Sequence, residues 1–149
     1  MDTPLMGVFF YSGGYMDVRV YYEDTDAGGV VYHSNYISYM ERARTEFLRE
    51  HGLSVREMHD MGIIFPVVAI EVNFRAPARL DDLLEVRTRI AELRNSSFVA
   101  AQQVVRKEDG KLLVDAKVTL ACVSPEIKAR RLPSEIRELF TRLLQEQGE

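Results

Sequence analysis

Apolar positions recur along this chain with two different spacings, and the changes between them mark the boundaries of the predicted elements. Residues 16–23 alternate between apolar and polar positions, which predicts a strand with one buried face. That face is formed by Met16, Val18, Val20 and Tyr22. Residues 36–48 instead place apolar side chains three and four positions apart, which predicts a long amphipathic helix. We expect Ser34 to be the N-cap of this helix and Gly52 to end it.

After this helix the chain returns to the spacing of two that is typical of strands. Ser54 and Glu57 have the capping-box spacing, so a short second helix is expected to begin here and to end near Gly62. The strands that follow are predicted in residues 63–74, 84–93, 98–106 and 112–123. The turns between the last three are Asn95-Ser96 and Asp109-Gly110. A helical spacing returns in residues 136–144, which predicts an amphipathic helix at the C-terminal end.

These elements define a fold of the α+β class. One strand, a long helix and four further strands pack most economically as an antiparallel sheet of about five strands wrapped around a central helix. Repeats, low-complexity tracts and linkers are not present in the sequence, so we expect one domain over residues 15–149. Residues 1–14, which end in a Ser-Gly-Gly break, are expected to form a flexible arm ahead of that domain.

Composition and charge narrow the classes of function. A chain of 149 residues suits a single domain, and a formal net charge of −4 with a pI near 5.5 argues against a nucleic-acid-binding protein. The sequence contains no apolar run of the roughly 18 residues that a membrane-spanning helix needs. Its N-terminal apolar patch lacks the basic residues of a signal peptide, and the single cysteine, Cys122, suits a reducing compartment. We therefore expect a cytoplasmic protein without a transmembrane segment.

The densest group of chemically useful residues lies between the first strand and the long helix. Residues 22–36 read YEDTDAGGVVYHSNY, with several carboxylates, two glycines and a histidine close together. An ionised aspartate acts as a general base or as a nucleophile, and both Asp24 and Asp26 are candidates. Residue types alone do not choose between the two.

The residues after these aspartates can build the remainder of a catalytic site. Gly28 and Gly29 permit positive φ angles and a close approach of a ligand to the backbone. The N–H groups at the start of the following helix suit a carbonyl oxygen that acquires negative charge. His33, at the start of that helix, could orient the aspartate, hold a water molecule or shape an acyl pocket.

Other catalytic chemistries have little support in the sequence. His51 and His59 lack partners at the spacing of a zinc site, so we expect neither a metal nor another cofactor. The chain contains no G-x-S-x-G motif, and Cys122 lies in the middle of a predicted strand, where a core position is expected.

The stretch from RVYY at residues 19–22 to ERAR at residues 41–44 resembles the signature of the 4-hydroxybenzoyl-CoA thioesterase-like branch of the hotdog proteins. More narrowly, residues 18–145 are similar to the acyl-CoA thioesterases associated with the bacterial Tol–Pal system. The resemblance implies a single hotdog domain that hydrolyses short- to medium-chain, or aromatic, acyl-CoA thioesters without a metal or redox cofactor. It also implies a homo-oligomer, a dimer or a tetramer, with active sites at the subunit interface.

The resemblance also assigns roles to single residues. It makes Asp26 the catalytic carboxylate, either as a nucleophile or as a general base for water. It places the helix-start amides around Tyr32 and His33. The residues that we expect beside the substrate are Gly28, Gly29 and Tyr36. For the phosphates of CoA, which favour basic side chains, the candidates are Arg130 and Arg131, in a cluster with Lys128 after the last strand.

Three alternatives to this interpretation remain. Glu41 is a second candidate catalytic carboxylate, because some relatives of the wider fold use a glutamate on the helix. A hydratase of this fold would need a histidine close to Phe65-Pro66, and none directly precedes that pair. The main alternative is a weakly active binding protein that docks acyl carrier protein or phospholipid-synthesis enzymes.

Overall fold

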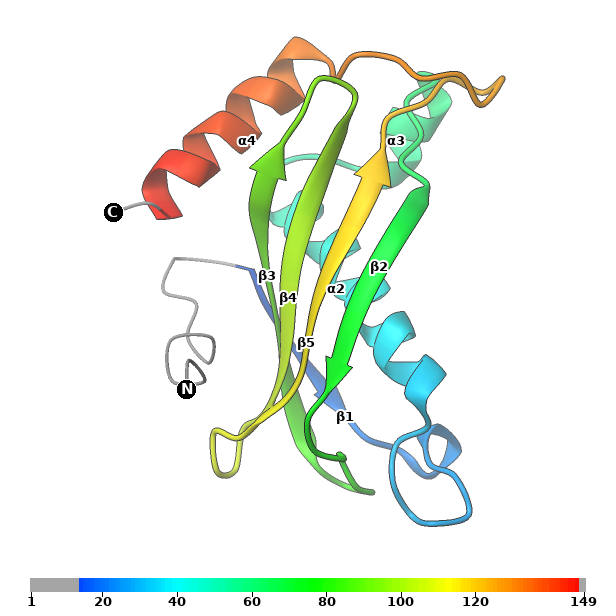
Figure 1. Ribbon diagram of the computed structural model, residues 1–149, viewed down its shortest axis with the longest axis vertical. Helices are drawn as coiled ribbons and strands as arrows, with labels where there is room; N and C mark the ends of the chain where they lie inside the picture. Colours follow the sequence, from blue (N-terminus) through cyan, green and yellow to red (C-terminus); the bar gives the residue numbers. More distant parts are fainter. Residues whose placement is uncertain (1–13, 148–149) are drawn as a thin grey trace.

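The elements of the computed structural model, which describes residues 14–147, follow the predicted order (Figure 1). The strands are β1 (Tyr15–Arg19), β2 (Val67–Phe74), β3 (Leu83–Leu93), β4 (Ser97–Arg106) and β5 (Leu112–Ala121). The helices are the short 3₁₀ helix η1 (Tyr22–Asp24), α2 (His33–Glu50), α3 (Val55–Asp60) and α4 (Ser134–Gln147). The arm predicted for residues 1–14 lies outside the described residues, except for Gly14. Within residues 14–147, no helix is both long enough and apolar enough to cross a membrane.

The five strands form one antiparallel sheet in the order β1-β3-β4-β5-β2. β3, β4 and β5 follow one another as hairpins and fill its middle, whereas β2 lies at the edge and pairs only with β5. α2 runs across one face of the sheet, which we call the inner face (Figure 1). This arrangement confirms the predicted α+β fold, with an antiparallel sheet around a long helix and a further helix at the C-terminal end.

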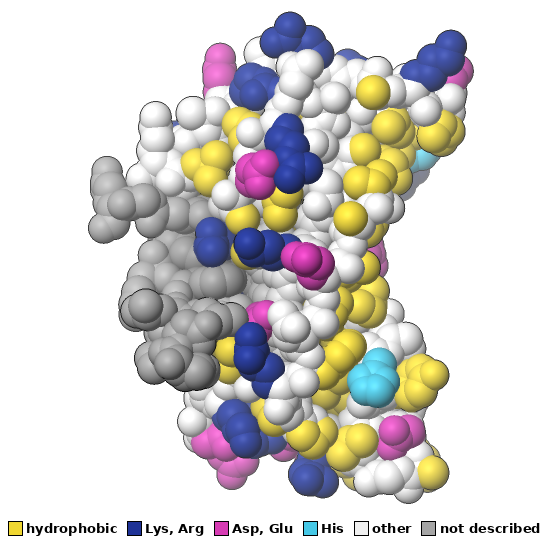
Figure 2. Space-filling view, in the orientation of Figure 1, with side chains coloured by type: hydrophobic (Ala, Val, Ile, Leu, Met, Phe, Trp, Pro, Cys, Tyr) yellow, Lys and Arg dark blue, Asp and Glu magenta, His cyan; other side chains and the backbone are white. Residues whose placement is uncertain are grey.

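The outer face of the sheet is polar. Figure 2 shows basic and acidic side chains interspersed over the strands on this face. Two of the ion pairs on it join Arg75 to Asp115 and Arg87 to Glu85. The outward-facing residues Val99, Ala101 and Val105 of β4 are buried as well, but the two hydrophobic clusters that hold the helices lie on the inner face.

α2 is held on the inner face by its apolar side chains. The buried residues of the helix, at the predicted spacing, are Tyr36, Tyr39, Met40, Ala43, Phe47 and Leu48. They share their core with inward-facing strand residues such as Leu84, Val86, Val104 and Val114. Gly52 ends the helix as predicted, because its φ of 83° lets the Leu53 N–H reach the Leu48 carbonyl at 2.9 Å.

The prediction of Ser34 as the N-cap of α2 is wrong. The helix begins at His33, and its N-cap is Tyr32, whose side chain makes no capping bond. The physical reason is a contact with the preceding loop. The Tyr32 N–H and the Asn35 side-chain amide both donate to the Asp24 carbonyl, at 3.1 and 2.8 Å. These bonds start the helix two residues earlier than the local sequence predicts.

The first strand is shorter than predicted. β1 stops at Arg19, because the chain then turns into η1, where the Asp24 carboxylate accepts the Tyr21 N–H at 2.9 Å. Tyr22 was expected on the buried face and is instead 81% exposed. The alternating pattern thus continues past the end of the strand that it predicts.

The edge strand also differs from its prediction. β2 begins at Val67 and not at residue 63, and β5 ends at Ala121 and not at residue 123. Pro66 has no N–H with which to continue the ladder, although its carbonyl still accepts the Ala121 N–H at 3.0 Å. In the part of the predicted strand that precedes Pro66, the pairing is reduced to an isolated bridge between Ile64 and Val123.

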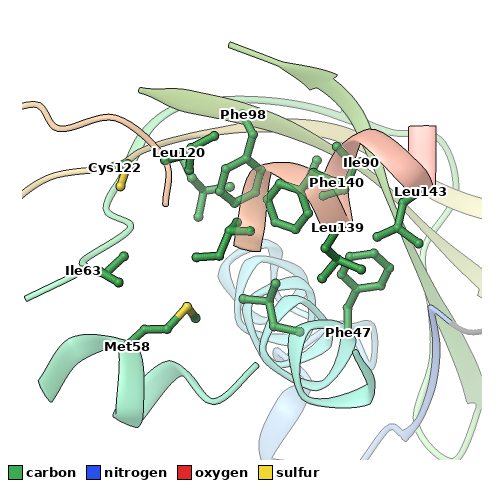
Figure 3. Packing of buried hydrophobic residues seen from close by; sticks show 14 of the residues in the cluster. Phe47, Met58, Ile63, Ile90, Phe98, Leu120, Cys122, Leu139, Phe140 and Leu143 are labelled. Carbon is green, nitrogen blue, oxygen red and sulfur yellow. The ribbon is translucent and has the colours of Figure 1, made fainter. Parts of the chain in front are cut away.

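The far end of the inner face has a second core, to which α4 contributes. Figure 3 shows the rings of Phe98 and Phe140 packed against each other in this cluster. Their centroids are 4.8 Å apart in an edge-on arrangement. Phe47 of α2 and Leu139 of α4 belong to the same cluster, so α4 closes this end of the layer between helix and sheet. Cys122 is buried here, as predicted.

Replacing Phe140 with alanine tests how far α4 stabilises the fold. Its ring is fully buried, so we expect the free energy of unfolding in urea to fall by about 3–5 kcal/mol. Arg142→Ala, at an exposed position of the same helix, is the matched control and should change it by less than about 0.5 kcal/mol. If both substitutions changed the free energy of unfolding by the same small amount, α4 would not unfold cooperatively with the rest of the domain.

Candidate active site

Asp26 lies in a tight loop between η1 and α2. Its N–H donates to the Val30 carbonyl at 2.9 Å, and the Gly29 N–H donates to the Asp26 carbonyl at 3.0 Å. The Gly28 N–H donates to Asp26 Oδ1 at 2.8 Å. Gly29 has a φ of 80°, which glycine adopts without strain. The loop therefore holds one oxygen of the carboxylate, and no donor from the described residues reaches the other oxygen, Oδ2.

The loop is tied to the body of the protein through the segment that follows β2. Val30 pairs with Arg79, and the Val31 N–H donates to the Ala78 carbonyl at 2.9 Å. The Ala78 N–H in turn donates to the hydroxyl of Tyr36 on α2, at 2.9 Å. Burial raises the pKa of Tyr36, so this hydroxyl stays neutral at physiological pH. The helix and the loop thus share one hydrogen-bonded connection.

Asp24, the other aspartate of the loop, has a different environment. Its carboxylate accepts a backbone N–H at 2.9 Å, and its carbonyl accepts the bonds from Tyr32 and Asn35. Burial raises the pKa of the neighbouring Tyr39, and the negative charge of Asp24 adds to that rise. Asp24 is thus engaged in holding the loop to the helix, whereas Asp26 faces a cleft.

The N-terminus of α2 next to this loop has free N–H groups. The Tyr32 N–H is bonded to Asp24, and the Asn35 N–H donates to the Tyr32 carbonyl at 2.9 Å. The N–H groups of His33 and Ser34 have no acceptor in the part of the chain that the structure describes. The free amides at the helix start are therefore those of His33 and Ser34. The Tyr32 N–H, which was expected to be one of the donors, is already bonded to the Asp24 carbonyl.

Asp26 and His33 line the same cleft, which has a volume of about 300 Å³. The remaining lining residues are Val30, Val31, Tyr36, Phe74, Arg75, Ala76 and Pro77. The His33 ring packs on Phe74, at the end of β2, with the ring centroids 4.7 Å apart. Among the described residues it makes no hydrogen bond to the Asp26 carboxylate. Of the three roles expected for His33, the structure favours the last, because its ring forms part of the wall of the cleft.

The predicted basic cluster lies at the other end of the sheet. Arg130 donates to a backbone carbonyl of the segment that precedes β2, at 3.1 Å, whereas the cleft lies where β2 ends. From Val67 to Phe74 the strand rises seven residues, or about 23 Å. Within one chain, Arg130 and Arg131 are therefore too far from Asp26 to share its cleft.

A second cavity, of about 250 Å³, lies between α2, α3 and the sheet and was not predicted. Glu41 lines this cavity and not the Asp26 cleft, because it lies eight residues, or about 12 Å, along α2 from His33. Arg44 also lines it and donates to Gln102 at 3.1 Å, and burial lowers the pKa of Arg44. Sequence analysis gave no indication of this cavity. The signal that it missed is Gln102, which accepts the bond from Arg44 in the cavity wall and is a polar residue at an inward position of an apolar strand.

The cleft can support attack on a carbonyl group. A carboxylate beside free helix N–H groups combines a base or nucleophile with donors for a developing oxyanion. Within residues 14–147, no group of three or more His, Cys, Asp and Glu side chains is placed to hold a metal ion. The chemistry that these residues suit is transfer of an acyl group to water.

A sheet wrapped around a helix whose N-terminus meets a carboxylate loop defines the hotdog class of enzymes, and solved structures confirm this fold. A hypothetical protein from Thermus thermophilus has a TM-score of 0.82 and 37% identity, over 88% of this chain and 99% of its own. The 1,4-dihydroxy-2-naphthoyl-CoA thioesterase from Synechocystis has a TM-score of 0.80 and 27% identity, over 87% and 96%.

The chain belongs to the thioesterase superfamily, whose sequence profile matches residues 28–113. The acyl-CoA thioester hydrolase YbgC of Escherichia coli O6:H1 is 49% identical over 120 residues, which are 80% of this chain and 89% of that protein. The matched region includes the glycines of the loop, α2 and most of the sheet. The fold and the enzyme class expected from the signature are thereby confirmed.

Substitution of Gly28 with alanine tests whether the loop sets the position of the Asp26 carboxylate. An added Cβ would lie 3.3 Å from Asp26 Oδ1, so the carboxylate must shift slightly. Because a displacement of about 1 Å can cost about 10² in rate, we expect thioester hydrolysis to slow about tenfold without a large change in melting temperature.

Gly29→Ala is the contrasting variant. Its Cβ meets open space, but the φ of 80° strains alanine, so stability should fall by about 1–2 kcal/mol. Unchanged hydrolysis in Gly28→Ala would contradict the role given to the loop.

Proposed function

We propose that this protein hydrolyses acyl-CoA thioesters to a free acid and CoA, with Asp26 as the catalytic carboxylate. The observation that carries the proposal is that Asp26 and His33, the first residue of α2, line one cleft. The relatives add support, since the Escherichia coli protein is named an acyl-CoA thioester hydrolase and the Synechocystis protein a 1,4-dihydroxy-2-naphthoyl-CoA thioesterase.

In the proposed reaction the thioester oxygen points at the free N–H groups of His33 and Ser34. Asp26 either removes a proton from water, whose oxygen attacks the carbonyl carbon, or attacks that carbon itself. The second route gives a mixed anhydride, which water then hydrolyses. In both routes the two N–H groups stabilise the negative charge on the carbonyl oxygen. The C–S bond breaks, and the CoA thiolate leaves and takes up a proton.

The proposed substrates carry short- to medium-chain or aromatic acyl groups. Tyr36, His33 and Phe74 give the cleft an aromatic lining, which suits an alkyl chain as well as a ring. Gly28 and Gly29 lie in the loop beside the cleft, where a backbone without Cβ atoms admits a close ligand. Association with the Tol–Pal system and a cytoplasmic location stay part of the proposal, supported by the sequence signature and by the single cysteine.

We infer that the protein acts as a homodimer joined through β2. This edge strand is exposed over almost its whole length, although most of its residues are apolar. Val68, Ile70 and Phe74 are 60%, 39% and 47% exposed. Figure 2 shows apolar side chains gathered along the side of the molecule that β2 and α2 form. An open apolar edge is an unusual feature of a monomer, and antiparallel pairing with the β2 of a second copy would cover it.

The same dimer would supply the CoA site. Antiparallel pairing brings the start of each β2 to the end of the other, so the basic cluster of one copy approaches the Asp26 cleft of its partner. Arg130 and Arg131 are then available for the phosphates of CoA, which guanidinium groups bind well. Acyl groups on a carrier protein would use the same cleft, with the carrier in place of CoA.

Thiol release from a panel of acyl-CoAs, from acetyl to palmitoyl with benzoyl types, tests the proposed activity. We expect Asp26→Asn to lower kcat/KM by about 10²–10⁴, the usual cost of losing a general base. Asp24→Asn is the matched control and should lower kcat/KM less. The helix start depends on the backbone carbonyl of Asp24, which this substitution leaves in place.

Turnover that survives Asp26→Asn would move the chemistry to Asp24 or Glu41. If the wild-type protein hydrolyses no member of the panel, docking of acyl carrier protein or of phospholipid-synthesis enzymes becomes the better explanation.

The assembly can be tested with two lysine substitutions in β2. Ile70 lies on the inner face and Ala69 on the outer face of the strand, opposite Val118 and Thr119. Ile70→Lys should convert the dimer to a monomer in analytical ultracentrifugation and lower hydrolysis, because it buries a charge at the contact. Ala69→Lys should keep both. A fully active wild-type monomer would refute the dimer, and a tetramer would require a second contact.

A further inference from the structure

Helix α2 begins without a capping side chain. Its N-cap is Tyr32, whose side chain makes no capping bond, and its first turn contains no acidic residue. A serine, threonine, aspartate or asparagine at the N-cap would accept the N–H of the second or third helical residue. α3 has this usual arrangement, since the Ser54 hydroxyl accepts the Glu57 N–H at 3.1 Å. At α2 the missing cap leaves the Ser34 N–H, the second of the helix, without an acceptor among the described residues, like the His33 N–H before it.

The side chain of Asn35 fastens the start of α2 in a different way. Asn35 is the third residue of the helix, and its Nδ2 atom donates to the Asp24 carbonyl at 2.8 Å. A carbonyl oxygen only accepts hydrogen bonds, so the atom that faces it must be the amide nitrogen. The Tyr32 N–H donates to the same oxygen at 3.1 Å, and the two lone pairs of a carbonyl serve both donors. Asn35 thus anchors the helix as a donor and occupies neither of the free N–H groups.

This anchor joins the two halves of the proposed catalytic site. Asp24 belongs to η1, where its carboxylate accepts a backbone N–H at 2.9 Å, and Asp26 follows two residues later. Thr25, between the two aspartates, is held by a bridge to Val31. The loop and the start of α2 therefore lie together at one end of the molecule (Figure 1). The hydrogen bond from Asn35 fixes the helix start relative to the segment that carries the catalytic carboxylate.

We propose that Asn35 is a positioning residue for thioester hydrolysis, which holds the free amides of α2 in place beside Asp26 without occupying them. The proposal rests on the proposed thioesterase function and adds a residue that acts through the helix start, since Asn35 is not part of the lining of the Asp26 cleft. A capping oxygen would also hold the helix, but it would take an N–H group that the oxyanion needs. An amide donor at the third helical position meets both requirements.

A role in stability alone is the alternative, and Asn35→Asp distinguishes the two. Aspartate has the shape of asparagine but presents an oxygen in place of the donor. A negative charge in the first turn stabilises a helix, which offsets the loss of one hydrogen bond. The new carboxylate repels the Asp24 carbonyl and attracts the helix N–H groups, where it competes with the oxyanion. A structural role predicts little change in activity, whereas a positioning role predicts a large loss.

Asn35→Asp should therefore separate activity from stability. We expect kcat to fall about 10²-fold, a usual cost of losing one oxyanion donor, while KM stays within about threefold of the wild-type value. The melting temperature should change by less than about 4 °C. Thiol release from the acyl-CoA that the wild-type protein hydrolyses fastest gives kcat and KM, and circular dichroism gives the melting temperature.

Two matched variants show whether the donor or the charge is responsible. Asn35→Gln keeps the amide donor on a longer side chain and should recover kcat to within about tenfold of the wild-type value. Ser38→Asp places the same charge at an exposed position of α2, three residues or about 4.5 Å further along the helix. It should leave kcat and KM within about twofold. If Ser38→Asp is as slow as Asn35→Asp, the charge alone is the cause and the proposal fails.

Failure of this proposal is distinguishable from failure of the proposed function. A wild-type protein that hydrolyses no acyl-CoA refutes both. Hydrolysis that depends on Asp26 but is as fast in Asn35→Asp as in the wild-type protein refutes the role of Asn35 alone. So does a parallel fall of kcat and melting temperature in Asn35→Asp and Asn35→Gln, because the residue then only stabilises the fold. If Asn35→Asp does not fold, Asn35→Leu replaces it as the variant without a donor, with the same expected fall in kcat.

Discussion

Burial of one face of α2 against the sheet is the interaction on which the rest of the structure depends. Tyr36, Met40 and Phe47 are almost fully buried, and close packing around them leaves the helix one position on the sheet. The N-terminus of the helix, with its free amides, is thereby placed beside the end of β2. The exposed Asp26 loop takes its position from backbone bonds to this helix and to residues 78–79. A buried helix face thus determines where an exposed carboxylate lies.

The same packing leaves one edge of the molecule incomplete. α2 packs mainly on β1 and β3, on the far side of the sheet from β2, so the inner face of β2 has little cover. The cavity and the basic cluster lie at one end of β2, and the Asp26 cleft lies at the other. A two-fold pairing of β2 would cover the exposed strand and bring these separated parts together. The exposed edge therefore follows from the position of α2 on the sheet.

The long helix and the central strands could be predicted because burial of one face repeats at regular intervals along each of them. The errors lie where another local feature, or a contact with a preceding loop, overrides the repeating pattern. Ser34 is a good N-cap residue, but bonds to Asp24 start the helix at His33. Tyr22 continues the alternation of β1, but η1 turns the chain away. Pro66 interrupts a run of apolar residues that otherwise reads as one strand.

By itself, the sequence determined the fold class, the order of its elements and the grouping of Asp26, the two glycines and His33 in one short stretch of the chain. These features depend on residues that are neighbours in the chain. Only the tertiary structure decided that Asp26 and not Asp24 lines the cleft, that the free amides are those of His33 and Ser34, and that Arg130 is remote from them. Those outcomes depend on which distant segments meet when α2 packs on the sheet, and a local pattern contains no information about that meeting.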